Sequence, residues 1–132
     1  RRIQGLYTLT AADVLERRAF QDAVVACGYC LDMHSPGGPG DDSWFQYPAG
    51  YYQIPYRCLV PVRVENLLVA GRCISATHEA LAGVRVMIPC MAMGQAAGTA
   101  AALSLAAGIP PRKLNPQILR ASLREQGAFI PE

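Results

Sequence analysis

Residues 66–108 read NLLVAGRCISATHEALAGVRVMIPCMAMGQAAGTAAALSLAAG, and the rest of the chain is organised around them. It opens with four apolar residues, 67–70, which Gly71 follows directly. An apolar run of this length, bounded by turn residues, is too short for a helix and predicts a buried strand.

The same stretch closes with a long run rich in Ala and Gly. Pro89 suits the first turn of a helix, where its missing N–H is no loss, so we expect a helix over about 87–107 that Gly108 ends. A polar loop over 72–85 connects the strand to the helix. This order of strand, glycine, loop and helix N-terminus is typical of cofactor-binding sites. A face of small side chains on the helix predicts close packing against a sheet; its residues are Gly94, Ala97, Gly98 and Ala101.

Composition places the chain in the globular class. It has 132 residues, 52% of them hydrophobic, which is enough for a domain with a real core. The net charge of +2, without a basic run, gives no reason to expect nucleic acid as a partner. Five scattered cysteines and no secretory signal favour a reducing, cytoplasmic location. Because the first residue is Arg1, we expect the chain to be part of a larger protein.

One apolar stretch, 88–107, approaches the length of a membrane-spanning helix. It contains Pro89, Gln95 and Thr99, and most of its apolar residues are alanines. We therefore expect a buried helix and no membrane.

Short elements are predicted before this stretch. Thr10 and Asp13 resemble a capping box that opens a helix through about residue 18. Strands are expected over 2–8 and 29–34, a short strand or a turn over 23–26, a loop over 35–43, and an extended connection over 56–60. The aromatic segment 44–56 is either a substrate-covering loop or an edge strand packed on the core.

A last helix is predicted over about 116–126. Asn115 is its cap, Pro116 its first residue, and Gly127 lies beyond its end. We expect Ile118, Leu119 and Leu123 on its buried face. The fold class is thus α/β (or α+β), and the chain divides into two parts, residues 1–60 and 61–132.

The sequence offers two sites based on cysteines, a thiol–disulfide pair and a zinc site. Cys27 and Cys30 have the C-x-x-C spacing of thiol–disulfide oxidoreductases, but they run into a strand where that motif requires a helix, so two buried cysteines without a redox role are favoured. Zinc binding by these cysteines with Asp32 and His34 lacks a second pair, so no metal site is predicted.

The loop over 72–85 carries the remaining candidates. His78 and Glu79 lie within it, and Arg72 and Arg85 lie at its ends. Positive charge beside free N–H groups at a helix start suits an anion, or a ring that becomes anionic. The alternative is that Arg85 and Glu79 pair with each other or cap nearby backbone, and both interpretations remain open.

Several ordered segments resemble the C-terminal part of a family of FAD-dependent oxidoreductases. These segments are IPYRCLVP at 54–61, ENLLVAGRCISATHEA at 65–80 and VRVMIPCMAMGQAAGTAAA at 84–102, with DAVVA at 22–26 and LDMH at 31–34. The family is similar in fold to the glutathione reductase and succinate dehydrogenase flavoproteins.

The resemblance implies a flavin site, with residues 1–60 as part of a substrate or cap region and residues 61–132 as the C-terminal portion of the FAD-binding domain. Residues 67–70 would be the last strand of a Rossmann-like FAD-binding domain, in which Gly71, with Ala70 and Arg72 beside it, lies near the ribityl and pyrophosphate part of FAD. Many relatives carry an acidic residue where Arg72 stands. The backbone of Val86, Met87 and Ile88 would face the pyrimidine side of the flavin. His78 and Arg85 would be catalytic, as proton donor or as anchor for a substrate anion, with hydride passing between an organic small-molecule substrate and the flavin.

One departure from the family is large. The dinucleotide fingerprint G-x-G-x-x-G is missing, and SPGGPG at 35–40 lacks the strand and helix that it needs. We therefore expect a C-terminal segment that binds FAD poorly by itself and that associates with the N-terminal half of the flavoprotein or with a second copy. The alternative function is a non-catalytic fragment or assembly module that binds no cofactor on its own.

Overall fold

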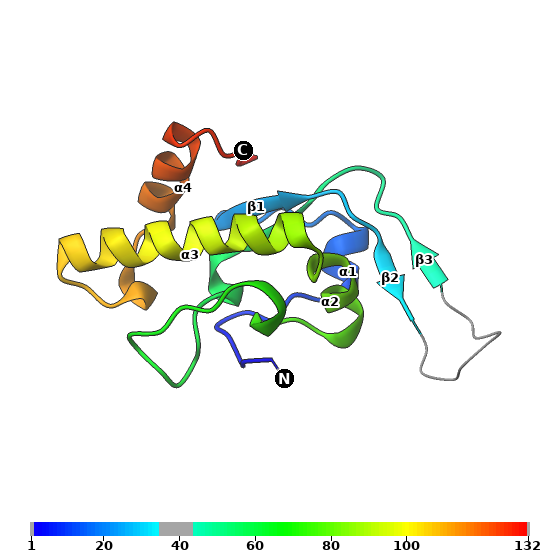
Figure 1. Ribbon diagram of the computed structural model, residues 1–132, viewed down its shortest axis with the longest axis horizontal. Coiled ribbons are helices and arrows are strands. Elements are labelled where there is room, and N and C mark those ends of the chain that lie inside the picture. The colour runs from blue at the N-terminus through cyan, green and yellow to red at the C-terminus, as the bar shows by residue number, and fades with distance from the viewer. Residues whose placement is uncertain (1, 35–43, 132) are drawn as a thin grey trace.

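A computed structural model describes residues 2–34 and 44–131, and it combines helices with short strands (Figure 1). The mixed α/β class expected from the sequence is confirmed. The predicted loop over 35–43 lies outside the described residues. The elements are α1 (Ala11–Leu15), β1 (Ala23–Cys27), β2 (Leu31–Met33), β3 (Trp44–Gln46), β4 (Tyr52–Pro55), α2 (His78–Val84), α3 (Met87–Ala107) and α4 (Pro116–Glu125), with 3-10 turns η1 (Tyr56–Cys58), η2 (Gly71–Cys73) and η3 (Pro111–Lys113).

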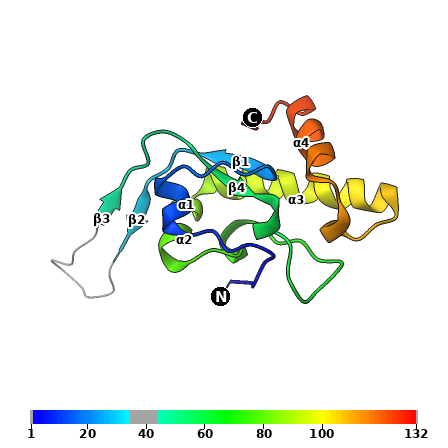
Figure 2. The same ribbon diagram turned by 180° about the vertical axis from the view of Figure 1, so that it is seen from behind.

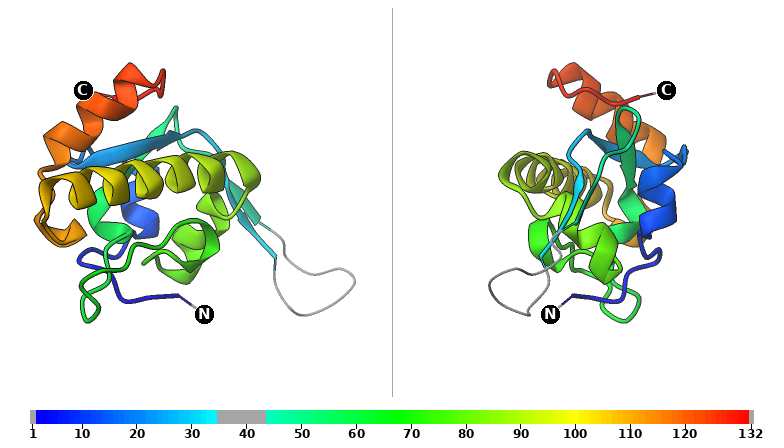
Figure 3. Two further views of the ribbon diagram at one scale, coloured as in Figure 1. Left: turned by 60° about the vertical axis from the view of Figure 1, so that its left-hand side comes forward. Right: turned by 90° about the vertical axis from the view of Figure 1, so that its right-hand side faces the viewer.

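Strands β1 and β4 form the centre of the molecule. They pair antiparallel, Val25 opposite Ile54 and Cys27 opposite Tyr52. The rear view in Figure 2 and the end-on view in Figure 3 show this sheet between α3 on one side and α1 on the other. Both strands are almost entirely buried because both of their faces are covered, which explains their nearly continuous apolar sequence.

The second sheet continues from the same segments. Strands β2 and β3 pair antiparallel, Leu31 opposite Gln46 and Met33 opposite Trp44, and they extend from the body of the molecule beside α2 (Figure 1). The aromatic segment 44–56 therefore supplies β3 and β4, in agreement with the strand interpretation, although Tyr47 and Tyr51 remain exposed.

Three local predictions are confirmed in detail. The Thr10 side chain accepts from Asp13 N at 3.2 Å while Asp13 accepts from Thr10 N at 2.9 Å, which is a complete capping box at α1. Helix α3 covers 87–107 and ends at Gly108, whose φ of 63° requires the left-handed conformation that glycine adopts readily. Asn115 caps α4, which begins at Pro116.

The predicted strand over 67–70 is wrong. These residues form no ladder among the described strands; the segment is joined to the core by one bond, from Val69 N to Leu59 O at 2.9 Å. Leu67 is 41% exposed. Apolar composition suits a strand, but a strand also needs a neighbour at hydrogen-bonding distance along its length, and the described residues offer none here.

Other boundaries also differ from expectation. The loop over 72–85 contains η2 and the whole of α2, because Thr77 accepts from Ala80 N at 3.3 Å and starts a helix there. Residues 56–58 form the turn η1, and residues 2–8 make a single bridge, Gly5 to Pro61. Strand β2 is shorter than the predicted 29–34.

The buried face of α3 is offset from the predicted one. Met93, Ala96 and Ala100 are fully buried against the core that includes β1. Gly94 and Gly98 are exposed, and a Cβ added at either one would meet none of the described neighbours within 4 Å. The small-residue face therefore does not pack on the described sheet. On α4, Leu119 and Leu123 are buried as predicted, but Ile118 is 53% exposed.

Two helical glycines differ sharply in surroundings, and this difference predicts opposite effects of alanine. A Cβ at Gly83 would lie 2.8 Å from Tyr52 Oη and 3.0 Å from Leu31 Cδ2, whereas a Cβ at Gly94 meets nothing within 4 Å. We expect Gly83→Ala to lower the free energy of unfolding by ~1–3 kcal/mol through overpacking. Gly94→Ala is expected to raise it by ~0.5–1 kcal/mol through helix propensity. Urea unfolding of the two variants checks both, and a Gly83→Ala chain as stable as Gly94→Ala would contradict the packing.

Asp13 predicts a pH dependence of stability. Burial alone raises the pKa of this carboxyl, but hydrogen bonds from the Thr10 backbone and hydroxyl, from Tyr7 and from Arg18 outweigh burial and hold the pKa below its ordinary value. A lowered folded-state pKa stabilises the fold above the ordinary value of 3.8 and ceases to do so as the pH falls below it. Wild type should therefore exceed Asp13→Asn most in unfolding free energy near pH 6, and the difference should shrink toward pH 2.5. A difference that stays constant over this range in urea unfolding would remove Asp13 as the source.

Candidate functional site

No side chain of residues 2–34 or 44–131 caps the N-terminus of α3. Val86 occupies the cap position with extended backbone, φ −77° and ψ 165°, and its apolar side chain can accept no hydrogen bond. The third helical residue is Pro89, which has no N–H. The N–H groups of Met87 and Ile88 are therefore without a side-chain acceptor, and these two residues are 78% and 80% exposed. Such a helix end attracts an anion or a partial negative charge.

Two arginines flank this helix end. Arg72 and Arg85 line an open cavity of about 520 Å³ together with Val86, Met87 and Asp32. The Arg85 Nη2 donates to the Asp32 carbonyl at 3.1 Å and lies 3.9 Å from the Asp32 carboxylate. Strand β2 thus holds the Arg85 guanidinium beside the start of α3, and the cavity has an excess of positive charge.

His78 lies near the same arginine. It is exposed at the first position of α2, and a small cavity of about 80 Å³ is lined by His78, Arg85, Asp32 and His34 among others. The His34 Nε2 lies 2.9 Å from Asp32 Oδ1. His78 and Arg85, the two residues that the sequence offered as catalytic, therefore line one small cavity, because seven positions on α2 are about two helical turns and return to the same face.

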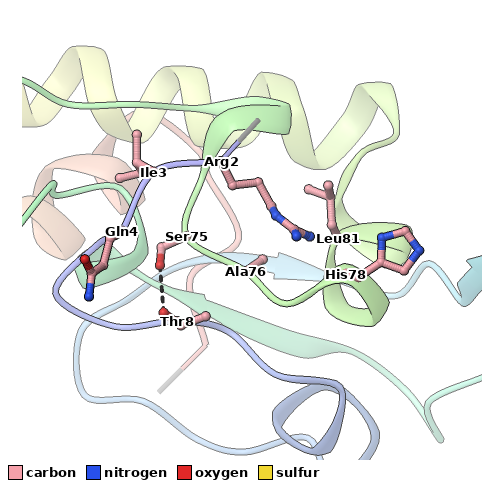
Figure 4. A pocket seen from close by; sticks show the side chains of 8 residues that line it. All are labelled: Arg2, Ile3, Gln4, Thr8, Ser75, Ala76, His78 and Leu81. Atoms are coloured by element: carbon pink, nitrogen blue, oxygen red, sulfur yellow. Dashed lines mark hydrogen bonds between the residues drawn. The ribbon is translucent and has the colours of Figure 1, made fainter.

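His78 also borders a second, larger cavity of about 720 Å³, shown in Figure 4. There the Arg2 guanidinium points toward Leu81 and His78, and a hydrogen bond of 2.9 Å joins the Thr8 and Ser75 hydroxyls in its wall. His78 thus faces open space on two sides, which leaves its imidazole accessible to a small molecule.

Gly71 is needed for its backbone conformation, which a residue with a side chain adopts only under strain. Its φ is +69°, where residues with a side chain are strained, while an added Cβ would meet Cys90 Sγ only at an ordinary 3.6 Å. Gly71 starts η2 directly after Ala70, which is extended at φ −139° and ψ 165°. The sharp turn from Ala70 into Gly71 brings Arg72 to the cavity at the α3 N-terminus.

Asp32 is the member of this site that sequence reasoning missed. Its carboxylate and carbonyl hold both Arg85 and His34. The sequence indicated Asp32 and His34 only as ligands of a zinc site that lacks a second cysteine pair. Arg85 pairs with Asp32 and not with Glu79. The Glu79 carboxylate accepts hydrogen bonds from its own backbone N–H and from the Thr77 hydroxyl, and these bonds lower its pKa.

The cysteines of the C-x-x-C spacing are buried. Cys27 and Cys30 are 7% and 5% exposed, and both are free thiols. Cys27 lies against the Gly83 carbonyl, with Sγ to O at 3.9 Å. This burial agrees with the interpretation that they have no redox role. Within residues 2–34 and 44–131, no group of three His, Cys, Asp or Glu side chains is arranged to hold a metal ion.

Helix α3 is long and apolar enough to cross a membrane by length and composition alone. It has 21 residues, and 22% of its most apolar window is buried in this structure. The expectation of a buried helix therefore holds for one face only.

These features define a class of site: an uncapped helix N-terminus between two guanidinium groups, suited to a group that carries or develops negative charge. The family model for FAD dependent oxidoreductase matches residues 1–123. The chain therefore belongs to the FAD-dependent oxidoreductase family. No curated protein and no solved structure matches the chain.

The uncapped N-terminus predicts a stability gain from a new cap. A serine at position 86 can accept from the Ile88 N–H, whereas an alanine there removes the same apolar atoms and accepts nothing. We expect Val86→Ser to be more stable than Val86→Ala by ~0.5–2 kcal/mol in urea unfolding. Equal stability of the two variants would show that the Ile88 N–H is already satisfied.

Proposed function

We propose that this chain forms the ring-facing wall of a flavin site in an FAD-dependent oxidoreductase, and that the enzyme transfers hydride between a small organic substrate and the flavin. The observation that carries the proposal is the uncapped N-terminus of α3 between Arg72 and Arg85, in a chain that belongs to this family.

The residues present fit FAD by their chemistry. The pyrimidine side of a flavin accepts hydrogen bonds and becomes more negative on reduction, and free N–H groups with nearby guanidinium groups match that demand. The helix terminus contributes ~0.3–1 kcal/mol to such stabilisation when exposed and up to ~2 kcal/mol when partly buried. When bound, FAD supplies the hydride acceptor or donor.

Each residue then has a role. The backbone of Val86, Met87 and Ile88 binds the pyrimidine side of the ring. Gly71, with Ala70 and Arg72, lies against the ribityl and pyrophosphate part.

His78 and Arg85 act on the substrate. His78 holds or donates a proton, since its imidazole is exposed to both neighbouring cavities. Arg85, kept in place by Asp32, anchors an anionic group of the substrate.

A second function is favoured by the exposed surface of α3. Met91 and Leu105 are 74% and 85% exposed, beside the bare Gly94 and Gly98, and residues 67–70 have backbone groups without a ladder partner. This surface suits the Rossmann-like N-terminal half of a flavoprotein or a second copy of the chain. Without such a partner the chain is an assembly module that binds no FAD.

Titration of FAD separates the two functions. We expect the isolated chain to give no saturable change in flavin fluorescence at micromolar concentration, whereas the parent protein that carries this chain should be yellow and bleach on reduction. Micromolar binding by the chain alone would show that it is self-sufficient. A parent protein that takes up no FAD would overturn the flavin proposal.

A charge placed at position 86 tests the ring-facing role directly. In the parent protein, Val86→Asp sets a carboxylate where negative charge develops on reduction, so it should lower the flavin reduction potential. Val86→Asn, of the same shape but uncharged, is the matched control. Spectroelectrochemical titration measures both; equal potentials would place the helix terminus away from the ring.

A further inference from the structure

The cavity of about 720 Å³ in Figure 4 lies between the N-terminal segment and the segment that leads into α2. Backbone hydrogen bonds join these two segments at both ends of the cavity. The Ile3 N–H donates to the Cys73 carbonyl at 3.0 Å, and the Leu9 N–H donates to the Ser75 carbonyl at 3.0 Å. The walls of the cavity are therefore held in place by the backbone of the fold.

The lining of this cavity contains one guanidinium and no acid. The Arg2 guanidinium points toward Leu81 and His78 (Figure 4), and both Arg2 and His78 are exposed, so a ligand can reach them. Among residues 2–34 and 44–131, no group forms a hydrogen bond or an ion pair with this guanidinium. The cavity thus presents an available positive charge.

The nearby acid, Glu79, does not line the cavity. Its pKa is lowered chiefly by hydrogen bonds from its own backbone N–H and from the Thr77 hydroxyl, and less by the charges of His78 and Arg2. The Glu79 carboxylate therefore already has its own donors and leaves the guanidinium to a ligand.

Much of the remaining lining is apolar. Ile3, Ala76 and Leu81 supply hydrocarbon surface, and the Thr8 and Ser75 hydroxyls bond to each other at 2.9 Å. The volume lies in the range of about 300–1,000 Å³ that is typical of small-molecule sites and exceeds what a bare oxyanion fills. A cation beside apolar surface suits an anion that has a hydrocarbon body.

We propose that this cavity binds a small organic carboxylate. The Arg2 guanidinium binds the carboxylate through charge-assisted hydrogen bonds, His78 is a second donor, and the hydrocarbon body lies on Ile3, Ala76 and Leu81. The inference goes beyond the flavin proposal and is independent of it, because every residue of the lining belongs to this chain and the test contains no FAD.

The test is an NMR titration of the ¹⁵N-labelled chain that follows the Arg2 Nε–Hε signal and the amide signals of Ile3 and Ala76. Acetate, hexanoate and inorganic phosphate are added in separate series at constant ionic strength, with chloride as the reference. We expect saturable shifts with hexanoate. Hexanoate should bind at least about 10-fold more tightly than acetate, because its additional methylene groups contact the apolar wall.

Three variants assign the effect. Arg2→Gln removes the charge, so the affinity for hexanoate should fall by about 10-fold or more. His78→Ala removes the second donor and should lower the affinity by about 5-fold. Arg63→Gln is the matched control: it makes the same change in net charge, and Arg63 is exposed and does not line the cavity, so binding should be unchanged.

Several outcomes would overturn the proposal. These are the absence of a saturable shift with both carboxylates, saturable binding of phosphate alone, and an Arg2→Gln chain that binds hexanoate as well as wild type does. An equal loss of affinity in Arg2→Gln and Arg63→Gln would also overturn it, because it would show non-specific attraction to net charge. None of these outcomes bears on whether the parent protein takes up FAD.

Discussion

Helix α3 lies on strand β1 through Met93, Ala96 and Ala100, all of which are fully buried. This contact sets the positions of both ends of the helix. At one end β2 continues from the β1 segment and brings Asp32 beside Arg85 and the uncapped N-terminus. Near the middle of the helix, the Gln95 amide and the Thr99 hydroxyl donate hydrogen bonds to Gln126, the residue that ends α4.

Two residues of this structure, Val86 and Arg120, are less favourable for stability than other residue types would be at the same positions. A valine caps α3 where a serine or aspartate would satisfy a free N–H, and Arg120 is buried without a carboxylate. Elsewhere the same chain follows local rules closely, as at the Thr10 and Asp13 box and at the Asn115 cap. Departures from local consistency concentrate at functional sites in folded proteins, and Val86 lines the cavity of the proposed flavin wall.

Sequence reasoning succeeded where the signal was local. The capping box, Pro89 in the first turn of α3, and Gly108 at its end each depend on neighbours within four residues. It failed where a distant partner decided the outcome. Residues 67–70 have a strand composition but no ladder among the described strands, and the buried face of α3 is Met93, Ala96 and Ala100 rather than the small-residue face. Asp32 was missed for the same reason, since its importance comes from Arg85, 53 residues away.

The sequence by itself determined the mixed class, the limits of α3 and α4, and the family resemblance, because periodicity, caps and ordered motifs are written in consecutive residues. The tertiary structure fixed which face of α3 is buried, that Arg85 contacts Asp32 of β2, and that Arg120 lies in a desolvated position. These features arise when segments far apart in the chain pack together and exclude water, and the balance of burial and pairing that results cannot be read from any one segment.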